Sequence, residues 1–597
     1  MRTYLKENYL LLAFFLVLAL LVTYPTIWHP FTAVPGDSRS DVWDHLWGYW
    51  RTEKAFFVEH QFPYEERHMN HPEGGVLFHV DLLNSFFMLP LRAIFGMTGA
   101  YNLLVWGHLV ISGMGMYHLS RRFTTHRLPA VFAGVAFAFS PYMLALTLTS
   151  GVANRLNITW IPLFFLFYLK LIEEDNNVKN TLYASLMFLF ATAGCWLYGL
   201  YVFMICALLS IFVLLSPLRK VKPQDLLHHY RDLVLKKMLP LLIGCGLAGI
   251  PIGLTASRSI SSESSGIYQR EHQMFWDGSS ELQVMNHFGL YNFFTPNKQG
   301  LVVSNTFDML FQTTYLGFAL LFLGALSLLS RKRYSAFFFP CAIIFFTLAL
   351  GPEIRLFRGS QDTFNSPVFL FFAQVVPYMT AHEVPWEFIL PGIFCAGVAS
   401  AMGIDWLISN IRSTQWKIIG GCELILVLVL ENFLISPASV PVTTTTTEVP
   451  AFYYELADNT EEFAVFDFPT TRPNSTLLPT EYFYYQTIHK KPIPYAVQMS
   501  WLNTHQFWIA LTKRQQGTGL GTTVMEQFGG CLPGASFGCG TTERIRDELA
   551  EDNFRYFVVH LRLIRTEEVE DYLKLFTTMF GEPYYRDSEV LVFQIQQ

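Results

Sequence analysis

The sequence has 597 residues, of which 52% are hydrophobic and only 15% charged, and its formal net charge is −6. Because soluble chains carry about 25% charged residues, this composition excludes an ordinary soluble protein. A nucleic-acid-binding protein is excluded too, since the chain has no basic domain and no module of basic and aromatic residues. The apolar residues fall in runs of about 17 to 23, the length that crosses a hydrocarbon core of about 30 Å.

The first apolar run lies at the N-terminus, where Arg2 and Lys6 precede the segment from Tyr9 to Val22, as in a signal peptide. The run continues to Trp28 without a small-residue cleavage motif, which predicts an uncleaved signal anchor. With the runs that follow, it predicts a polytopic α-helical membrane protein of about eleven transmembrane helices. The expected spans are 8–28, 101–119, 128–149, 157–173, 181–197, 199–216, 238–256, 311–329, 334–350, 385–408 and 416–436.

The short loops between these spans are alternately rich and poor in Lys and Arg. Basic loops mark the cytoplasmic side, so the pattern predicts a multi-pass protein of the cell membrane with a cytoplasmic N-terminus. The segment 80–95 is also apolar, but it contains Asp81, Pro90 and Arg92. If this segment crossed the membrane, every later basic loop would move outside, so we expect it to lie in the outer interface.

The predicted membrane domain occupies residues 1–436 and has three long outer loops, 29–100, 257–310 and 351–385. Residues 437–450 are rich in Pro and Thr, which indicates an extended linker. In 451–597, strand-like runs such as 462–468 and 557–560 alternate with helix-like runs such as 541–550 and 567–580, a pattern typical of a small α/β domain. The topology places this C-terminal domain outside the cytoplasm.

Two cysteines lie in the C-terminal domain, Cys531 and Cys539, within a Gly-rich stretch. An oxidising compartment would favour a Cys531–Cys539 disulfide, and two free thiols are the alternative. The other six cysteines fall in predicted spans, where a thiol is a small apolar side chain.

The first outer loop begins with a cluster of acidic residues directly after the first predicted span. If a helix starts near Ser38, Asp37 caps it, and Asp41 and His45 share one face four residues apart. Carboxylates at a membrane–water boundary can act as a general base toward a hydroxyl, or can hold a divalent cation against a phosphate. The alternative is that Asp37 is only a helix cap and Asp41 only a solvated side chain.

A signal anchor followed by the pattern Gly36-Asp37-x₃-Asp41-x₅-Trp47 resembles the GT-C superfamily of membrane glycosyltransferases, and in particular its large bacterial polytopic members, many of them uncharacterised. No single motif is specific, but an ordered set extends the resemblance over most of residues 1–436 and more loosely beyond. The further segments are 101–122, 135–142, 160–163 and 195–200, then 466–469 and 485–492.

This resemblance implies a sugar donor carried on a polyprenyl phosphate or diphosphate, which enters from the membrane lipids. It also implies a glycan, lipid or protein acceptor on the outer side, and an inverting transfer. An acidic residue of the first outer loop would act as catalytic base or metal ligand, and Asp37 and Asp41 match its first and second acidic positions. The cofactor implied is a divalent cation, Mg²⁺ or Mn²⁺.

Several other residues are weaker candidates. Arg155, Arg258 and His382 could bind the donor phosphate, while Asp277 and His45 could contact the acceptor. Similar proteins have basic residues in an Arg-x-Pro-x-Arg-Phe pattern, where this chain has Glu383 and Glu387. This departure weakens a phosphate site there, and it raises the alternative that Glu383 shares catalytic or metal-binding duty with Asp37. Arg155 could equally be an interfacial anchor, and Asp277 a turn residue before Gly278.

Two functional hypotheses compete with a glycosyltransferase. One is a non-catalytic lipid or polysaccharide transporter or an assembly scaffold of the cell envelope, and the other is a sensor whose outer domain binds a ligand. A secondary transporter usually has repeat symmetry and polar residues at mid-membrane, whereas here the acidic residues gather at the outer surface. The sequence therefore favours chemistry at the interface.

Overall fold

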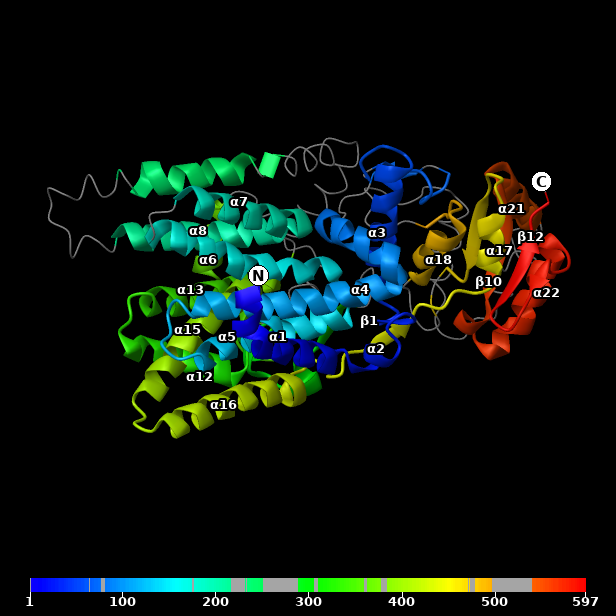
Figure 1. The fold of residues 1–597 in the computed structure, drawn as a ribbon. Helices are drawn as coiled ribbons and strands as arrows, with labels where there is room; N and C mark the ends of the chain where they lie inside the picture. The colour runs from blue at the N-terminus through cyan, green and yellow to red at the C-terminus, as the bar shows by residue number, and fades with distance from the viewer. Residues whose placement is uncertain are drawn as a thin grey trace.

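The computed structural model describes residues 2–63, 65–72, 74–76, 81–173, 177–215, 231, 233–247, 249–250, 288–304, 310–358, 362–376, 384–470, 472, 478–495 and 540–596. A bundle of helices forms most of the chain, and a small α/β domain lies at one end of it (Figure 1). The bundle consists of α1 (Arg2–Val22), α4 (Leu82–Ser120), α5 (Leu128–Ala138), η1 (Met143–Thr149), η2 (Ala153–Thr159), α6 (Trp160–Glu173), α7 (Asn177–Gly194), α8 (Trp196–Leu215), η4 (Leu233–Met238), α12 (Phe318–Leu326), η8 (Ser327–Ser330), α13 (Ser335–Ala349), η10 (Pro385–Phe388), α15 (Ile389–Ser409), α16 (Thr414–Leu430) and η11 (Glu431–Ile435).

Within the described residues, five helices are long and apolar enough to cross a membrane, or six if the bent pair Leu128–Ala138 and Met143–Thr149 forms one span. Three shorter apolar helices, Asn8–Val22, Phe318–Ser330 and Ser335–Ala349, coincide with further predicted spans. The span expected at 238–256 lies partly outside the described residues. The protein is thus a multi-pass helical membrane protein, and the number eleven stays a prediction.

Helix α4 contains both the segment predicted to lie in the outer interface and the span predicted at 101–119. Gly96, with φ +69°, has non-helical backbone between the two parts. Because glycine adopts this left-handed conformation without the steric cost of a Cβ, it divides the helix at the boundary that the sequence indicated. Asp81 precedes the first part as its N-cap, with its side chain accepting a hydrogen bond from the Asn84 N–H.

The segments predicted to be outer loops contain short helices and strands. Helix α3 lies across the end of the bundle, beside α18 of the outer domain (Figure 1). The short elements are α2 (Tyr24–Trp28), β1 (Ala33–Pro35), α3 (Val42–Phe57), β2 (Glu65–Glu66), β3 (Gly75–Val76), η6 (Leu290–Phe294), η7 (Asn297–Gly300), β4 (Val302–Ser304), β5 (Leu310–Gln312), β6 (Glu353–Arg355), β7 (Thr363–Asn365) and α14 (Pro367–Val375).

The C-terminal domain, called the outer domain here after its predicted side of the membrane, is built on a four-stranded sheet of order β11–β12–β10–β9, in which only β9 and β10 are parallel. One face of this sheet packs on α21 and α22 in a separate apolar core, and the other face turns toward α17 and α18. The elements are α17 (Phe452–Asp458), β9 (Ala464–Phe468), α18 (Glu481–His489), α21 (Gly540–Glu551), β10 (Phe554–His560), η12 (Leu561–Leu563), η13 (Thr566–Glu568), α22 (Val569–Phe580), β11 (Tyr585–Arg586) and β12 (Val590–Gln594).

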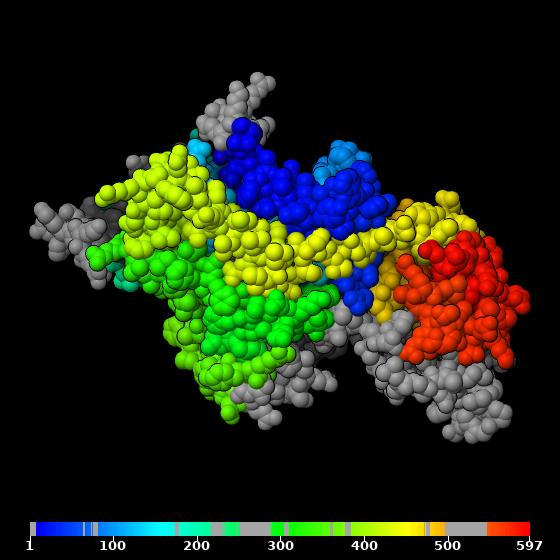
Figure 2. Space-filling model, turned by 90° about the horizontal axis from the view of Figure 1, so that it is seen from below, coloured from blue at the N-terminus to red at the C-terminus, as the bar shows by residue number. Residues whose placement is uncertain are grey.

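The Pro/Thr-rich segment that the sequence predicts to be a linker contains a strand. Its β8 (Thr444–Thr446) pairs antiparallel with β1, and the Val442 N–H donates to the Val22 carbonyl at the end of α1. Figure 2 shows this segment running along the N-terminal part of the chain toward the outer domain. The segment therefore ties the end of the last bundle helix to the beginning of the first outer loop.

The opposite end of the bundle is fixed by a buried carboxylate near the end of α15. Asp405 is 2% exposed and accepts hydrogen bonds from the Thr125 and His126 N–H groups, both 3.0 Å, and from Lys332 Nζ at 2.7 Å. Lys332 Nζ also donates to the Phe123 carbonyl at 2.8 Å. One carboxylate thus joins two loops that the sequence predicts to be cytoplasmic.

Candidate active site

The turn that carries Asp37 is held between two distant parts of the chain. The Gly36 N–H donates to the Thr443 carbonyl at 2.9 Å, and the Asp37 N–H donates to the Thr149 carbonyl at 2.7 Å. The Ser40 N–H and Oγ both donate to the Asp37 carbonyl, at 3.1 and 2.8 Å. Both the N–H and the carbonyl of Asp37 are therefore hydrogen-bonded, independently of its side chain.

Two glycines make this close approach feasible. Gly36 has φ +138°, and a Cβ added to it would lie 3.0 Å from Val42 Cβ. Gly151 has φ +64°, and a Cβ there would lie 2.6 Å from the same atom. Larger residues would clash with the first residue of α3 and would strain the backbone. The Gly36-Asp37 pair of the sequence pattern thus has a steric basis.

The carboxylate of Asp37 is buried and paired with its neighbour Arg39. Arg39 Nε donates to Oδ1 at 2.8 Å and Nη2 donates to Oδ2 at 2.9 Å, while the Arg39 N–H donates to Oδ1 at 3.0 Å. Burial by itself raises the pKa of Asp37, but the hydrogen bonds and charge of Arg39, with the charge of Arg472, outweigh it, and the pKa lies below its ordinary value. Asp37 is therefore ionised at neutral pH.

The expected helix start is wrong by several residues. Helix α3 begins at Val42, so its N-cap is Asp41 and not Asp37, and the Asp41 side chain makes no capping hydrogen bond. Asp37 instead lies in the turn before the helix, because its own backbone is engaged by Thr149 and Ser40. The expected spacing of Asp41 and His45 does hold, since the His45 N–H donates to the Asp41 carbonyl at 3.2 Å.

A third acidic residue, Asp81, lies in the same region of the outer face. It is 5% exposed and accepts from the Asn84 side chain at 2.7 Å and from the Tyr49 hydroxyl at 3.4 Å. Burial raises the pKa of Asp81 to about 7, although the hydrogen bonds from Asn84 favour its charged form. Tyr49, which donates to Asp81, also packs against Tyr101, with the two ring centroids 6.5 Å apart.

Arg155, predicted to bind the donor phosphate, has a carboxylate partner inside the protein. Its Nη2 lies 2.6 Å from Glu387 Oε1, and its Nη1 donates to Cys195 Sγ at 2.8 Å. Glu387 is 2% exposed and its Oε2 has no hydrogen-bond partner. The acidic residue that departs from the pattern of similar proteins therefore neutralises Arg155, and a role of Arg155 toward a phosphate stays a prediction.

The other predicted site residues lie outside the described residues: Arg258, Asp277, His382, Glu383, Cys531 and Cys539. Among the predicted residues that are described, Asp37, Asp41 and His45 come together on one stretch of the first outer loop. Sequence reasoning missed three contacts, namely those of Arg39 with Asp37, of Glu387 with Arg155 and of Arg472 with the Ser38 carbonyl. For Arg39 the close spacing to Asp37 was an available signal, whereas nothing local indicates the other two pairs.

The described residues contain no group of three His, Cys, Asp or Glu side chains that could hold a metal ion. Both oxygens of Asp37 are engaged by Arg39, so Asp37 could hold a divalent cation only after the Arg39 side chain had moved away. The described residues thus do not by themselves fit the predicted divalent cation.

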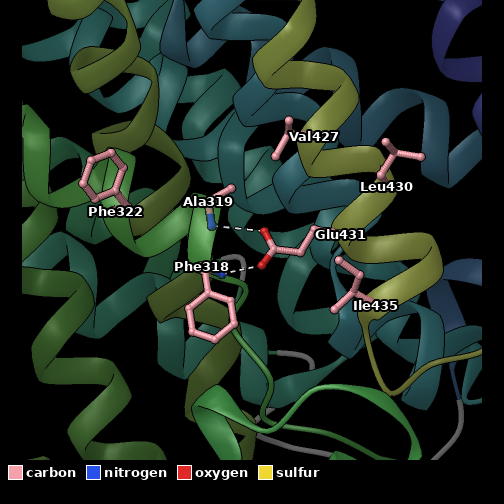
Figure 3. Close-up of a pocket in the computed structure, with 7 residues that line it drawn as sticks. All are labelled: Phe318, Ala319, Phe322, Val427, Leu430, Glu431 and Ile435. Carbon is pink, nitrogen blue, oxygen red and sulfur yellow. Dashed lines mark hydrogen bonds between the residues drawn. The ribbon is translucent and has the colours of Figure 1, made fainter.

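An apolar groove elsewhere on the bundle lies between α12 and α16 (Figure 3). Its one acidic side chain, Glu431, accepts from the N–H groups of Phe318 at 2.6 Å and Ala319 at 3.0 Å, and from the Tyr315 hydroxyl at 3.0 Å. Glu431 is therefore the cap of α12, because it satisfies donors that the start of a helix leaves open. The groove offers no carboxylate for chemistry.

Comparisons with known proteins give a fold but no sequence family. No family model matches the chain, and no curated protein matches its sequence. Among solved structures, the mycobacterial arabinofuranosyltransferase AftD aligns over 98% of this chain with a TM-score of 0.52 and 12% identity. The chain therefore shares the fold of this arabinofuranosyltransferase. The resemblance seen in the sequence is thus confirmed at the level of the fold, while the chain spans 41% of the length of AftD.

Two further structures align over most of the chain with lower scores. The oligosaccharyltransferase AglB of Archaeoglobus fulgidus, solved with an inhibitory peptide and a dolichol-phosphate, aligns with 12% identity and a TM-score of 0.44, covering 96% of this chain and 71% of its own. ArnT of Cupriavidus metallidurans, solved with undecaprenyl phosphate, aligns with 11% identity and a TM-score of 0.40, covering 98% of each chain.

Proposed function

We propose that the protein is a membrane glycosyltransferase that transfers a sugar from a polyprenyl-phosphate-linked donor to a hydroxyl acceptor on the outer side of the membrane. The observation that carries this proposal is the buried, ionised Asp37, held in a non-helical turn between β1 and α3 on a fold shared with AftD. The fold supports a glycosyltransferase as the class of enzyme, and the buried carboxylate supports the turn at Asp37 as the place where the reaction occurs.

Asp37 suits the acceptor side of such a transfer. Its lowered pKa makes it a weak base toward a free hydroxyl, but glycosyl transfer passes through an oxocarbenium-like transition state. The attacking hydroxyl becomes strongly acidic as its oxygen bonds to the anomeric carbon, so a carboxylate of low pKa can take the proton late in the step. Before that, the same carboxylate orients the hydroxyl by accepting its hydrogen bond.

The step balances without a further reactant. The acceptor oxygen forms a bond to the anomeric carbon, and the bond between that carbon and the phosphate oxygen breaks. The polyprenyl phosphate leaves with the bonding electron pair, and the hydroxyl proton passes to Asp37. A single displacement of this kind inverts the anomeric centre.

The leaving phosphate needs positive charge, which stabilises the charge that develops on it. Arg258 and His382 are the proposed donors, together with Arg155 if its bond to Glu387 opens. Asp41 is the second proposed acidic residue, and Glu383 the third. Asp277 and His45 are the proposed acceptor contacts.

The decisive experiment measures turnover by the purified full-length protein. A panel of polyprenyl-phosphate-linked sugars is offered with lipid and glycan acceptors to the wild type, Asp37→Asn and Asp41→Asn, each with EDTA or with added Mg²⁺ or Mn²⁺. Asp547→Asn, which removes an exposed carboxylate of the outer domain, is the matched control. We expect Asp37→Asn to lose turnover about 1000-fold, within the range for loss of a general base.

Three outcomes separate the hypotheses. Loss in Asp37→Asn but not in Asp547→Asn supports the proposal, and loss on EDTA treatment adds a cation. Loss confined to Asp41→Asn moves the catalytic role to Asp41. If the wild type turns over no donor, yet binds polyprenyl phosphate equally well in all variants, a transporter or scaffold becomes the better hypothesis.

A further inference from the structure

A buried arginine of the outer domain reaches the turn that carries Asp37. Arg472 Nη2 donates to the Ser38 carbonyl at 2.6 Å, and Trp43 Nε1 donates to the same oxygen at 2.9 Å. Arg472 is also paired with Glu481 at the start of α18, and the two side chains are only 9% and 5% exposed. The outer domain thus supplies a charged hydrogen bond, of the stronger kind, to the backbone beside the candidate base.

Helix α18 fixes this arginine in place by packing on α3. The rings of Tyr484 and Trp43 lie 5.3 Å apart, and Trp47 Nε1 donates to Gln486 Oε1 at 2.7 Å. Gln486 Nε2 in turn donates to the His68 carbonyl at 2.6 Å. Because these contacts come from Tyr484 and Gln486 of α18, the Arg472–Glu481 pair belongs to a junction that is packed on α3.

The bond at Ser38 acts on Asp37 through a single peptide group. The Ser38 carbonyl and the Arg39 N–H belong to the same planar unit, and that N–H donates to Asp37 Oδ1 at 3.0 Å. Fixing the carbonyl therefore fixes the direction of the N–H that holds the carboxylate. Hydrogen bonds in such a chain also strengthen one another, so the two donors on the carbonyl reinforce the contact on the other side.

The alternative support for Asp37 is much less rigid. The Arg39 guanidinium contacts both carboxylate oxygens, but its side chain is 46% exposed, and solvent weakens an ion pair of this kind. The Arg39 side chain can leave without breaking the fold, which an incoming acceptor hydroxyl requires. The backbone contact, backed by Arg472, stays when the side chain leaves.

We propose that Arg472 and Glu481 of the outer domain are positioning residues for Asp37, so that the active site is complete only when the outer domain is docked on α3. The kinetic consequence rests on the proposed function, whereas the structural consequence does not. The outer domain is then a structural part of the active site, and it is not an independent module on a flexible linker.

The first test follows hydrogen–deuterium exchange in peptides covering residues 36–43 of the purified full-length protein. Wild type is compared with Arg472→Gln, Arg472→Lys and the control Arg586→Gln, which alters an exposed arginine on β11. We expect exchange at the Arg39 and Ser40 amides to rise about tenfold in Arg472→Gln, the scale of one hydrogen bond to a charged group. Arg472→Lys should restore part of the protection, and Arg586→Gln should match wild type.

A second variant tests the same peptide group without breaking a buried ion pair. Trp43→Phe keeps the aromatic ring against Tyr484 but removes the indole N–H that donates to Ser38. We expect a smaller rise in exchange over the same residues. If both Arg472→Gln and Trp43→Phe exchange at the wild-type rate, the positioning role is wrong, and if Arg472→Gln fails to fold, Trp43→Phe decides.

The kinetic arm separates this proposal from the proposed function. If Asp37 is the reacting base, Arg472→Gln should lower kcat about tenfold with KM changed less than twofold, and Arg472→Lys should recover part of kcat. If Arg472→Gln raises exchange but leaves kcat unchanged, the positioning role of Arg472 is supported and the catalytic role of Asp37 is contradicted. Wild-type exchange with a lowered kcat would overturn the positioning itself.

Discussion

Two buried carboxylates at opposite ends of the bundle are held in different ways. Asp405 accepts from backbone and side-chain donors on loops far away in the sequence, and it has no freedom to leave them. Asp37 is also buried, but the partner of its two oxygens is Arg39, two residues away and 46% exposed. A carboxylate held by distant parts of the chain stabilises the fold, whereas one held by an exposed neighbouring side chain can exchange that partner for a substrate.

The largest difference in the free energy of unfolding should appear when the charge of Asp405 and that of Asp37 are removed in separate variants. Asp405→Asn should lower the free energy of unfolding by about 3 kcal/mol, because the buried carboxylate gives up a half-buried lysine partner and several hydrogen-bond donors lose their charged acceptor. Asp37→Asn should lower it by less than about 1 kcal/mol, since its partner is largely exposed to water. Unfolding by SDS titration in mixed micelles measures both, and equal losses would show that Asp37 is also a scaffold residue.

The buried His489 of the outer domain makes the stability of the fold depend on pH. The pKa of His489 is lowered from 6.5 to about 4, first by burial and then by the charge of Lys491, against the opposing effect of Asp467. Its Nδ1 accepts the Lys491 N–H at 3.0 Å, so protonation would break that bond. The unfolded state takes up this proton at higher pH than the folded state. The stability from His489 is therefore complete above about pH 6.5 and is lost as the pH falls toward 4.

The expected loss between pH 7 and pH 4.5 is about 2 kcal/mol for this one group. His489→Asn keeps an acceptor near the Lys491 N–H but cannot titrate, so its stability should fall less over the same range. Thermal unfolding of both proteins at the two pH values measures the difference. The same pH dependence in both would mean that other groups account for it.

Smaller effects should follow when only one donor of Asp405 is removed. Lys332→Met leaves the Thr125 and His126 bonds in place, and we expect a loss of about 1 kcal/mol. Arg333→Met on the same loop is the matched control. A loss as large as that of Asp405→Asn would mean that the lysine alone holds the carboxylate.

The smallest effect on stability should come from the partner of Asp37. Arg39→Gln should change the unfolding free energy by less than about 0.5 kcal/mol, as is usual for exposed pairs, while turnover changes about threefold through the contacts of Asp37. A stability assay and a turnover assay on the same preparation compare the two readouts. A large loss of stability without a change in turnover would reverse the roles assigned here.

Much of the secondary structure followed from local patterns. The elements β9, β10, α21 and α22 lie where the runs of the C-terminal domain predicted strands and helices, and the long apolar runs became helices. The start of α3 was predicted at Ser38 and lies at Val42. That error has a physical cause, because the backbone of Asp37 is taken by Thr149, a residue that no local pattern connects with it.

The sequence by itself determined the class of protein, the place of most helices and the position of an acidic turn after the first apolar run, because these depend on hydrophobic length and on nearby residues. Only the tertiary structure decided what surrounds that turn. The pairing of β1 with β8, the bond from Arg472 to Ser38 and the ion pair of Arg155 with Glu387 join residues more than two hundred positions apart. Such contacts depend on how helices pack and domains dock, and they leave no periodicity or spacing in the sequence.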